Sequence, residues 1–289
     1  MSDTLKYLVT GASGQLGSLV IEALLARVPA AEIGALVRRP EAAAPLEAKG
    51  VSVRVASYDD PAALEAAFAG VERVLLVSSS EVGKRAAQHE NVIDAAKRAG
   101  VRFVAYTSIL RADRSPLTVL PSEHVATEQA LAASGLPYAL LRNGWYTENY
   151  TMGVPLALEH GGLIGTIGDG RVSSASRADY AEAAAIVLSS DLPATGTVYE
   201  LAGDTAFSLP EFAAALSELS GQEIAYTDMS FEAYQAALIG AGLPAPVAEM
   251  LADSEKGAAQ GGLYSQDKSL STLLGRPTTP WRDTLAAAL

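Results

Sequence analysis

Short apolar runs alternate with longer stretches rich in alanine and leucine over the first 142 residues of the chain. The short runs contain many β-branched residues and do not alternate between polar and apolar positions, which is typical of strands buried on both faces of a sheet. The longer stretches have the length and composition of helices. Strands are predicted over residues 5–10, 33–38, 51–56, 71–78, 101–108 and 137–142, and helices over residues 14–27, 41–49, 60–69, 85–99 and 122–134.

This regular alternation predicts an α/β protein with a Rossmann-type, doubly wound parallel sheet. Helices between consecutive strands allow parallel pairing through right-handed crossovers. Glycines follow four of the predicted helices, at the positions where helices commonly end: Gly50, Gly70, Gly100 and Gly135. We therefore predict a dinucleotide-binding domain over residues 1–142.

The rhythm breaks after Arg142, where aromatic and glycine-rich segments begin. They are followed by a predicted helix over residues 177–189, a strand in the sequence TVYELAG and several further helices. No flexible linker is visible between the two halves. We predict that residues 143–289 form a smaller C-terminal α/β substrate lobe, closely packed and partly interleaved with the first domain.

Charge and composition narrow the classes of partner. The formal net charge of -12, without any run of basic residues, disfavours binding to nucleic acid and to anionic membranes. The absence of cysteine excludes disulfides and thiolate chemistry, and His89, His124 and His160 are too scattered for an expected metal site. No apolar run reaches the roughly 18 residues that a membrane span requires. We expect a cytoplasmic protein without membrane insertion, and a homodimer stays open.

The sequence TGASGQLG, residues 10–17, lies between the first predicted strand and the first predicted helix. Its G-x-x-G-x-x-G spacing allows a tight turn that brings backbone N–H groups and the helix N-terminus to a pyrophosphate. The alternative is a glycine turn with a purely structural role. The predicted cofactor contacts of this turn are Gly11, Ala12, Ser13, Gly14, Gln15 and Leu16.

The end of the second strand indicates which dinucleotide binds. An acidic residue there would bind the ribose 2′-hydroxyl of NAD, whereas arginine would bind the 2′-phosphate of NADP. The sequence carries Arg38 and Arg39 and no carboxylate, so NADPH is favoured over NADH, mainly through Arg38. The alternative is that both arginines begin a solvated helix.

Two further strand ends are expected to face the same ligand, because ligands lie beyond the carboxyl ends of parallel strands. Small hydroxyl residues follow the fourth strand at Ser78, Ser79 and Ser80, and the fifth strand ends in Thr107 and Ser108. We predict cofactor contacts from the three serines. After the third strand, Asp60 precedes a proline and is interpreted as a helix N-cap and not as an adenine contact.

Four motifs together resemble the NmrA-like group of atypical short-chain dehydrogenases. They are TGASGQLG, the LVRRP of residues 36–40, the blocks at 78–83 and 106–108, and LLRNGWYTENY at 140–150. Within this group the chain is similar to the bacterial type 2 NAD(P)H:quinone oxidoreductases, with triphenylmethane reductase as a relative. The resemblance runs nearly from end to end, and the RNGWYxENY segment is far more specific than the glycine motif.

The resemblance implies NADPH-dependent hydride transfer to a quinone or a similar conjugated acceptor. It places further cofactor contacts at Arg142, the last residue of the sixth strand, and directly after it at Asn143, Gly144, Trp145, Tyr146 and Thr147. It also implies that the acceptor ring is lined by Trp145, Tyr146 and Tyr150. The alternative for the aromatic residues is that they pack the interior of the lobe.

One feature of ordinary short-chain dehydrogenases is missing. Their Tyr-x-x-x-Lys pair is replaced by His124 and Glu128, and a glutamate would raise the pKa of a neighbouring acid where the lysine lowers it. Quinones accept hydride readily, so such a site needs mainly proximity and orientation. His124 is predicted to donate a proton or hydrogen bond to a quinone oxygen; the alternative is the polar front of a helix with Ser122 as its N-cap.

A second hypothesis belongs to a different class of protein. The same residues fit a non-catalytic NADP(H)-sensing regulator of the NmrA type, which binds the cofactor without turnover. Both hypotheses tolerate the missing Tyr-x-x-x-Lys pair, so only acceptor-dependent oxidation of NADPH separates them.

Overall fold

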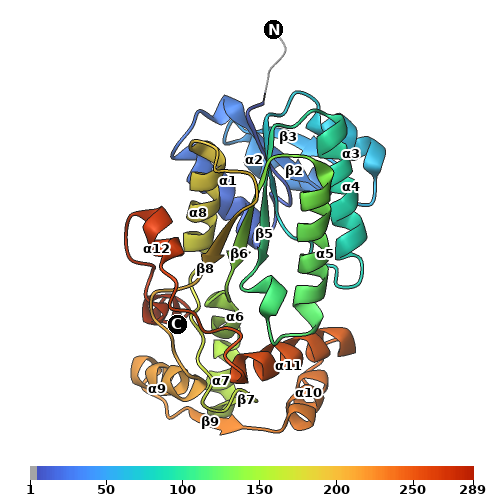
Figure 1. The fold of residues 1–289 in the computed structure, drawn as a ribbon. Coiled ribbons are helices and arrows are strands. Elements are labelled where there is room, and N and C mark those ends of the chain that lie inside the picture. Colours follow the sequence, from blue (N-terminus) through green and yellow to red (C-terminus); the bar gives the residue numbers. More distant parts are fainter. Residues whose placement is uncertain (1–4) are drawn as a thin grey trace. The chain divides into compact units, whose positions relative to one another are not determined.

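The computed structural model describes residues 5–289 and contains all six predicted strands. Figure 1 shows the fold. A seventh strand, β8 (Thr197–Leu201), completes a sheet with the order β3-β2-β1-β4-β5-β6-β8. Parallel pairing joins β1 to β2 and β4, β2 to β3, and β4 to β5. The predicted strands are β1 (Tyr7–Val9), β2 (Ile33–Val37), β3 (Ser52–Val55), β4 (Arg73–Leu76), β5 (Phe103–Ile109) and β6 (Tyr138–Asn143). The predicted Rossmann-type fold is confirmed.

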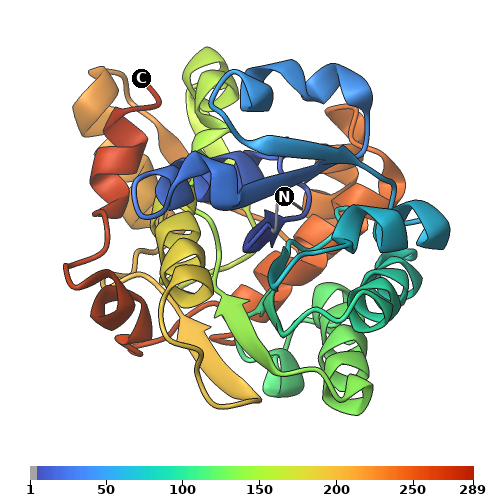
Figure 2. The same ribbon diagram turned by 90° about the horizontal axis from the view of Figure 1, so that it is seen from above.

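Helices cover both faces of this sheet. Figures 1 and 2 show α1 beside α8 on one face and α4 beside α5 on the other. The core on the face that carries α4 and α5 includes Leu8, Phe68, Val92, Tyr106 and Leu131. Full burial of a leucine, valine or phenylalanine side chain stabilises a fold by about 1.5–3 kcal/mol. The helices are α1 (Gln15–Leu25), α2 (Ala44–Glu47), α3 (Pro61–Phe68), α4 (Arg85–Arg98), α5 (Val119–Ser134) and α8 (Arg177–Ser189).

Helix α3 begins as the sequence predicts. The Asp60 carboxylate accepts a hydrogen bond from the Ala63 N–H at 3.0 Å, and Pro61 occupies the first helical position. This confirms the interpretation of Asp60 as an N-cap. The four glycines predicted to end helices all have positive φ, between 73° and 79°.

Helix α5 begins at Val119, so the prediction of Ser122 as its N-cap is wrong. The Ser122 hydroxyl instead donates to the Val119 carbonyl at 2.9 Å, within the first turn. The Asp253 carboxylate accepts from the N–H groups of Thr118 and Val119, at 2.8 and 2.9 Å. A residue more than 130 positions away in sequence therefore caps this helix, and local sequence could not reveal it.

The chain forms two compact units that alternate along the sequence. The first consists of the described part of Met1–Ser108 with Glu123–Arg142 and Arg177–Tyr199. The second consists of Ile109–Ser122, Asn143–Ser176 and Glu200–Leu289. One passage between the units falls directly after Arg142, and helix α8 belongs to the first unit. The division into lobes at residues 142 and 143 stays a prediction.

The second unit contains a two-stranded parallel sheet and several helices. Strands β7 (Gly162–Gly165) and β9 (Ala225–Asp228) pair in parallel. An aromatic cluster of Tyr150, Phe207, Phe212 and Trp281 has ring centroids 4.8–5.9 Å apart. The helices of this unit are α6 (Glu148–Thr151), α7 (Val154–His160), α9 (Leu209–Ser220), α10 (Phe231–Gly240), α11 (Ala245–Ala259), α12 (Ser269–Leu274) and α13 (Trp281–Ala286).

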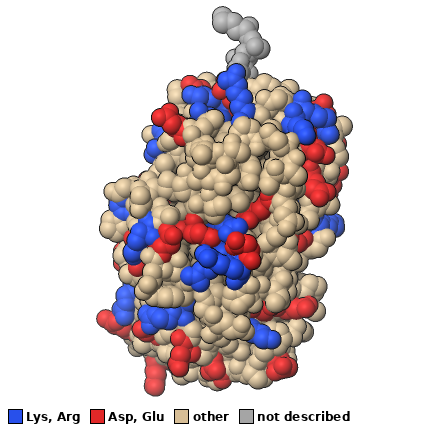
Figure 3. Space-filling view, in the orientation of Figure 1, with Lys and Arg blue, Asp and Glu red and all other residues tan. Residues whose placement is uncertain are grey.

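Acidic and basic side chains are interspersed over the face shown in Figure 3. Among the residues drawn in colour there, the basic ones form no continuous area on that face. Over residues 5–289, no helix combines the length and apolar character that crossing a membrane requires. Within the same range, no group of three or more acidic or histidine side chains is arranged to hold a metal ion.

A buried carboxyl in the second unit gives the protein a predicted pH dependence of stability. Glu255 is 8% exposed and accepts hydrogen bonds from the Thr166 N–H at 2.7 Å and the Tyr234 hydroxyl at 3.1 Å. Burial raises the pKa of Glu255 from 4.5 to about 7. The folded state then holds a proton that the unfolded chain releases, so the contribution to stability is complete below pH 4.5 and is lost as the pH rises to about 7.

We expect Glu255→Gln to remove this dependence, because glutamine keeps the hydrogen-bonding shape without a titratable group. Urea unfolding at several pH values should show the variant gaining stability relative to the unsubstituted protein as the pH rises from about 5 to about 8. Glu249→Gln, at an exposed position of the same helix, is the control. A constant difference between Glu255→Gln and the unsubstituted protein over that range would contradict the prediction.

Candidate cofactor and acceptor site

The glycine turn follows β1 and is shaped by backbone contacts. Gly11 has φ +58°, and its carbonyl accepts from the Gly14 N–H at 2.9 Å. A Cβ at Gly17 would lie 2.2 Å from the Gly11 carbonyl oxygen, so a side chain there would displace the turn. Helix α1 starts after Gly14 without a side-chain cap and without an acidic residue in its first turn. Its first N–H groups are therefore suited to an anionic ligand.

The predicted contacts of this turn divide into two kinds. Ser13, Gly14 and Gln15 are exposed. The side chains of Ala12 and Leu16 are buried in the protein, so only their backbone groups remain for a ligand.

Tyr58 supports the glycine turn through hydrogen bonds that local sequence could not reveal. Its hydroxyl lies within hydrogen-bond distance of the Thr10 hydroxyl and donates to the Val77 carbonyl at 3.0 Å. The Thr10 hydroxyl also accepts from the Val77 N–H at 2.9 Å. Burial raises the pKa of Tyr58, so its hydroxyl stays neutral. These contacts tie the ends of β1 and β4 together beside Gly11.

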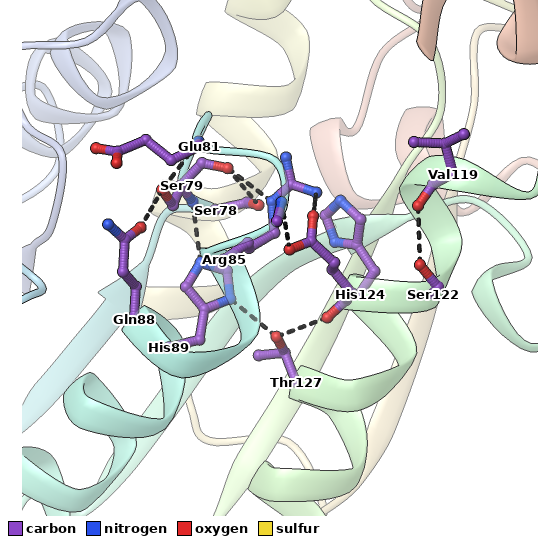
Figure 4. Close-up of polar contacts among 12 residues, drawn as sticks. Ser78, Ser79, Glu81, Arg85, Gln88, His89, Val119, Ser122, His124 and Thr127 are labelled. Carbon is purple, nitrogen blue, oxygen red and sulfur yellow. Dashed lines mark hydrogen bonds and ion pairs between the residues drawn. The ribbon is translucent and has the colours of Figure 1, made fainter. Parts of the chain in front are cut away.

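The loop between β4 and α4 contains the predicted serines and is held through its backbone, as Figure 4 shows. The Ser79 N–H donates to His89 Nε2 at 2.9 Å, and Arg85 Nε donates to the Ser79 carbonyl at 2.7 Å. The Ser78 N–H donates to Thr107 Oγ1 at 2.9 Å. Thr107 thus joins the ends of β5 and β4. Ser80 is exposed.

The protonation of His89 follows from these partners. A backbone N–H can only donate, so Nε2 accepts and the single ring hydrogen is on Nδ1. Nδ1 then donates to Thr127 Oγ1 at 2.9 Å, and the Thr127 hydroxyl donates to the Glu123 carbonyl at 2.9 Å. Burial, with a smaller contribution from the Arg85 charge, lowers the pKa of His89 to about 3. His89 is therefore a neutral connector between the loop and α5.

A buried ion pair holds the far end of the same loop. Arg85 Nη1 lies 3.0 Å from Glu123 Oε2, with side-chain exposures of 5% and 15%. The other Glu123 oxygen accepts from the Gly83 N–H at 3.0 Å. Helices α4 and α5 thus hold the loop at both Ser79 and Gly83. Local sequence could not reveal this group, because its members are separated by up to 40 residues.

His124 is buried on α5, and the choice between an acceptor contact and the polar front of a packed helix stays a prediction. His124 is 7% exposed, and its Nδ1 lies 2.7 Å from the Tyr106 hydroxyl. Burial, then the charge of Arg85 and the proximity of His89, lower the pKa of His124 well below 6.5. Burial also raises the pKa of Tyr106. Both groups are neutral at pH 7, so His124 can offer a hydrogen bond but is not a charged acid.

Glu128, one turn further along α5, has a structural partner. Arg142 Nε donates to its Oε1 at 2.9 Å, and Arg142 Nη2 donates to Oε2 at 2.6 Å. The Ser108 hydroxyl also donates to Oε1, at 2.6 Å. All three side chains are buried. Glu128 thus fixes Arg142 near the end of β6, and a cofactor contact by Arg142 stays a prediction.

The segment after β6 belongs to the second unit and is fixed there by its backbone. The Gly144 N–H donates to the Leu201 carbonyl at 2.7 Å, and the Thr147 N–H donates to the Ala175 carbonyl at 3.0 Å. Asn143 is 4% exposed, and within residues 5–289 its Oδ1 has no hydrogen-bond partner. A buried acceptor without a donor is costly. A ligand amide such as the nicotinamide carboxamide would supply the missing donor.

The aromatic residues predicted to line the acceptor site are Trp145, Tyr146 and Tyr150, which are all half-buried but differ in their surroundings. Tyr150 packs edge-on against Phe207, with ring centroids 5.3 Å apart, and so belongs to the aromatic cluster of the second unit. Contact of these three residues with an acceptor stays a prediction.

Arg38, predicted to bind the 2′-phosphate, follows β2 directly. Its side chain is 64% exposed, and Nη1 lies 2.8 Å from Glu81 Oε1. Glu81 lies on the same β4–α4 loop as the predicted serines. The guanidinium is thus at the expected strand end and accessible to a ligand.

A family model described as NAD(P)H-binding matches residues 11–191, from the glycine turn to the end of the first unit's helices. The chain belongs to this NAD(P)H-binding family. The match contains the glycine turn, Arg38, the loop between β4 and α4, and the segment after β6.

Individual members of the NAD(P)H-binding family are similar over almost the whole chain. Quinone oxidoreductase 2 of Escherichia coli K12 is 56% identical over 271 residues, covering 94% of each chain. The structure of an NADPH-dependent quinone oxidoreductase from Escherichia coli, complexed with NADPH, has a TM-score of 0.94 at 54% identity and covers 97% and 99% of the two chains. Triphenylmethane reductase of Citrobacter sp., complexed with NADP(H), has a TM-score of 0.93 at 37% identity and covers 98% and 100%. The resemblance that the sequence motifs indicated is confirmed.

Proposed function

We propose that this chain is an NADPH-dependent quinone oxidoreductase that transfers two electrons, as a hydride, to a quinone or similar conjugated acceptor. The deciding observation is the state of the two residues that replace the Tyr-x-x-x-Lys pair. His124 is buried and neutral beside Tyr106, and Glu128 is bound to Arg142. A site without a tuned acid suits an acceptor that takes hydride readily.

The residues of the chain fit the cofactor. The glycine turn and the N-terminus of α1 would hold its pyrophosphate, and Arg38 would bind its 2′-phosphate. The unpartnered Oδ1 of Asn143 would accept from the carboxamide of the nicotinamide. NADPH, when bound, supplies the hydride, and a quinone that has received it takes up one proton from solvent to become the hydroquinone. Gly144, Thr147, Trp145 and Tyr146 remain proposed contacts of the nicotinamide end, and Trp145, Tyr146 and Tyr150 of the acceptor.

Oxidation of NADPH in the presence of simple quinones tests this function. Acceptor-dependent loss of NADPH absorbance is expected with the full chain. Tight NADPH binding without any acceptor-dependent oxidation would favour the NADP(H)-sensing regulator and contradict the enzyme. A cytoplasmic location is a further proposal. A homodimeric state is another, and size-exclusion chromatography with light scattering would test it.

We propose that His124 donates a hydrogen bond to an acceptor oxygen. With Tyr106 donating to Nδ1, the hydrogen of the neutral imidazole is on Nε2, which can then donate. His124→Phe should lower kcat with quinones about tenfold, the effect of one lost hydrogen bond of about 1.5 kcal/mol. The KM for NADPH should stay close to its original value. His160→Phe, at an exposed position of α7, is the control.

The pH profile distinguishes hydrogen bonding from proton donation by an imidazolium. Because the pKa of His124 lies well below 6.5, kcat should show no ionisation of this residue between about pH 6 and 8. A decline of kcat with a midpoint near 6.5 that disappears in His124→Phe would contradict the hydrogen-bonding role. Full retention of kcat in His124→Phe would leave a packing role only.

A further inference from the structure

An ion pair connects two strand ends on opposite sides of β1. Arg38 follows β2 and Glu81 follows β4, and in the sheet these two strands are the neighbours of β1. Arg38 Nη1 and Glu81 Oε1 lie 2.8 Å apart. The pair therefore passes over the carboxyl end of β1, where Gly11 begins the glycine turn.

The position of Glu81 is fixed by the loop that carries it. His89 and Arg85 hold the loop at Ser79, and Glu123 holds it at Gly83. The Glu81 N–H itself donates to Ser79 Oγ at 3.2 Å. Figure 4 shows the Glu81 side chain pointing away from the buried Arg85 and His89. The Glu81 carboxylate therefore lies on the outer side of a loop that side chains of α4 and α5 hold.

Glu81 has two cationic neighbours and is only partly exposed. Besides Arg38, Lys84 Nζ lies 3.5 Å from Glu81 Oε2. The exposed fraction is 33% for the Glu81 side chain and 64% for that of Arg38. Of the two partners, the arginine is more accessible to an arriving ligand. Arg38 is also the residue proposed to bind the 2′-phosphate of NADPH.

We infer that Glu81 is a specificity-determining residue that competes with the 2′-phosphate for the Arg38 guanidinium. This inference rests on the role proposed for Arg38. A carboxylate and a phosphate are both anionic acceptors for the same N–H donors, and two anions beside one guanidinium repel each other. NADH carries a 2′-hydroxyl and meets no such competition. Glu81 therefore weakens binding of NADPH and of NADP+ selectively.

Two small nucleotides isolate the effect of the 2′-phosphate. Adenosine 2′,5′-bisphosphate and AMP differ only in that group, so calorimetric titration of both into the full chain measures its contribution. Glu81→Gln should tighten binding of the bisphosphate about two- to fivefold, the range expected when one exposed ion pair no longer competes. The affinity for AMP should not change. The pair is exposed, so the variant should fold normally.

Two further variants make the test specific. Glu41→Gln removes a negative charge at an exposed position three residues after Arg38, and should leave the ratio of the two affinities unchanged. In an Arg38→Ala background, Glu81→Gln should lose its effect on the bisphosphate. A persisting effect would show that Glu81 acts on the ligand without Arg38 and would overturn the inference.

Different results would contradict the two proposals, which are 2′-phosphate binding by Arg38 and competition by Glu81. If Arg38→Ala weakens the bisphosphate but Glu81→Gln leaves it unchanged or weaker, Glu81 does not compete, and the role of Arg38 stands. If Arg38→Ala weakens the bisphosphate and AMP equally, Arg38 does not bind the 2′-phosphate, and both proposals fail. Selective tightening by Glu81→Gln that depends on Arg38 supports both.

Discussion

Replacing Glu128 by alanine should destabilise the protein by about 3–5 kcal/mol, because the buried Arg142 guanidinium loses its bidentate carboxylate. The pair is bidentate, with exposures of 9% and 10%, and Ser108 adds a third hydrogen bond. Urea unfolding at pH 7 would measure the loss.

The control for this prediction is an ion pair of the same kind at the surface. Arg98 Nε lies 2.8 Å from Glu65 Oε2, with exposures of 45% and 51%. Glu65→Ala should cost no more than about 1 kcal/mol. Equal losses of unfolding free energy in Glu65→Ala and Glu128→Ala would contradict the prediction, because they would show that burial does not determine the cost of breaking the ion pair.

A second arm separates the lost charge partner from lost packing. Replacing both members, by Glu128→Leu and Arg142→Met together, should recover most of the stability lost in Glu128→Ala, since apolar residues of similar volume often replace a buried pair without loss. The double variant is compared by its stability and not by its activity, because Arg142 is a proposed cofactor contact. A double variant as unstable as Glu128→Ala would contradict the buried-charge explanation.

Arg38→Ala should raise the KM for NADPH about 10- to 100-fold and leave the KM for NADH almost unchanged. The loss corresponds to one charge-assisted hydrogen-bonding partner, about 1.5–3 kcal/mol. Steady-state kinetics with both cofactors and one quinone would measure it. Glu81 is present in both proteins compared, so the expected increase in the KM for NADPH is the one measured with Glu81 in place.

Arg39→Ala is the matched control for this variant. It removes the same charge from the neighbouring position and should affect NADPH much less, because phosphate binding depends on the geometry of a particular guanidinium. Equal changes in the KM for NADPH and NADH on Arg38→Ala would refute the assignment of the 2′-phosphate contact.

A polar group between α4 and α5 holds the backbone of the loop after β4. Two neutral histidines, His89 and His124, flank the Arg85–Glu123 pair. The arginine charge adds to burial in keeping both rings uncharged. A neutral imidazole can accept from a backbone N–H on one side and donate on the other, as His89 does. The loop backbone is therefore fixed before any cofactor arrives.

Much of the fold could be predicted because its signals are local. Each apolar run with its β-branched residues became a strand, and each glycine after a helix took a left-handed conformation. The start of α3 followed from the adjacent Asp60 and Pro61. The start of α5 could not be predicted, since its capping carboxylate comes from Asp253 on another helix.

The candidate site also combines features that local sequence predicts with features that depend on residues distant in the sequence. The glycine turn and the arginine after β2 were predictable because the chemistry and the strand–turn–helix context lie within a few residues. The contacts of His89, Tyr58 and Glu81 were not, because each depends on a partner that follows a strand distant in the sequence. His124 was identified by position alone, and its burial and neutral state came only from the structure.

The sequence by itself predicted the succession of strands and helices in the first unit, the glycine turn after β1 and the arginine at the end of β2. These depend on hydrophobic periodicity and backbone conformation, which act over short distances along the chain. The tertiary structure decided which polar groups meet: Glu128 with Arg142, His89 with Ser79 and Glu81 with Arg38. Such pairings depend on which strand ends and helix faces become neighbours, and that is settled only when the sheet and its helices pack.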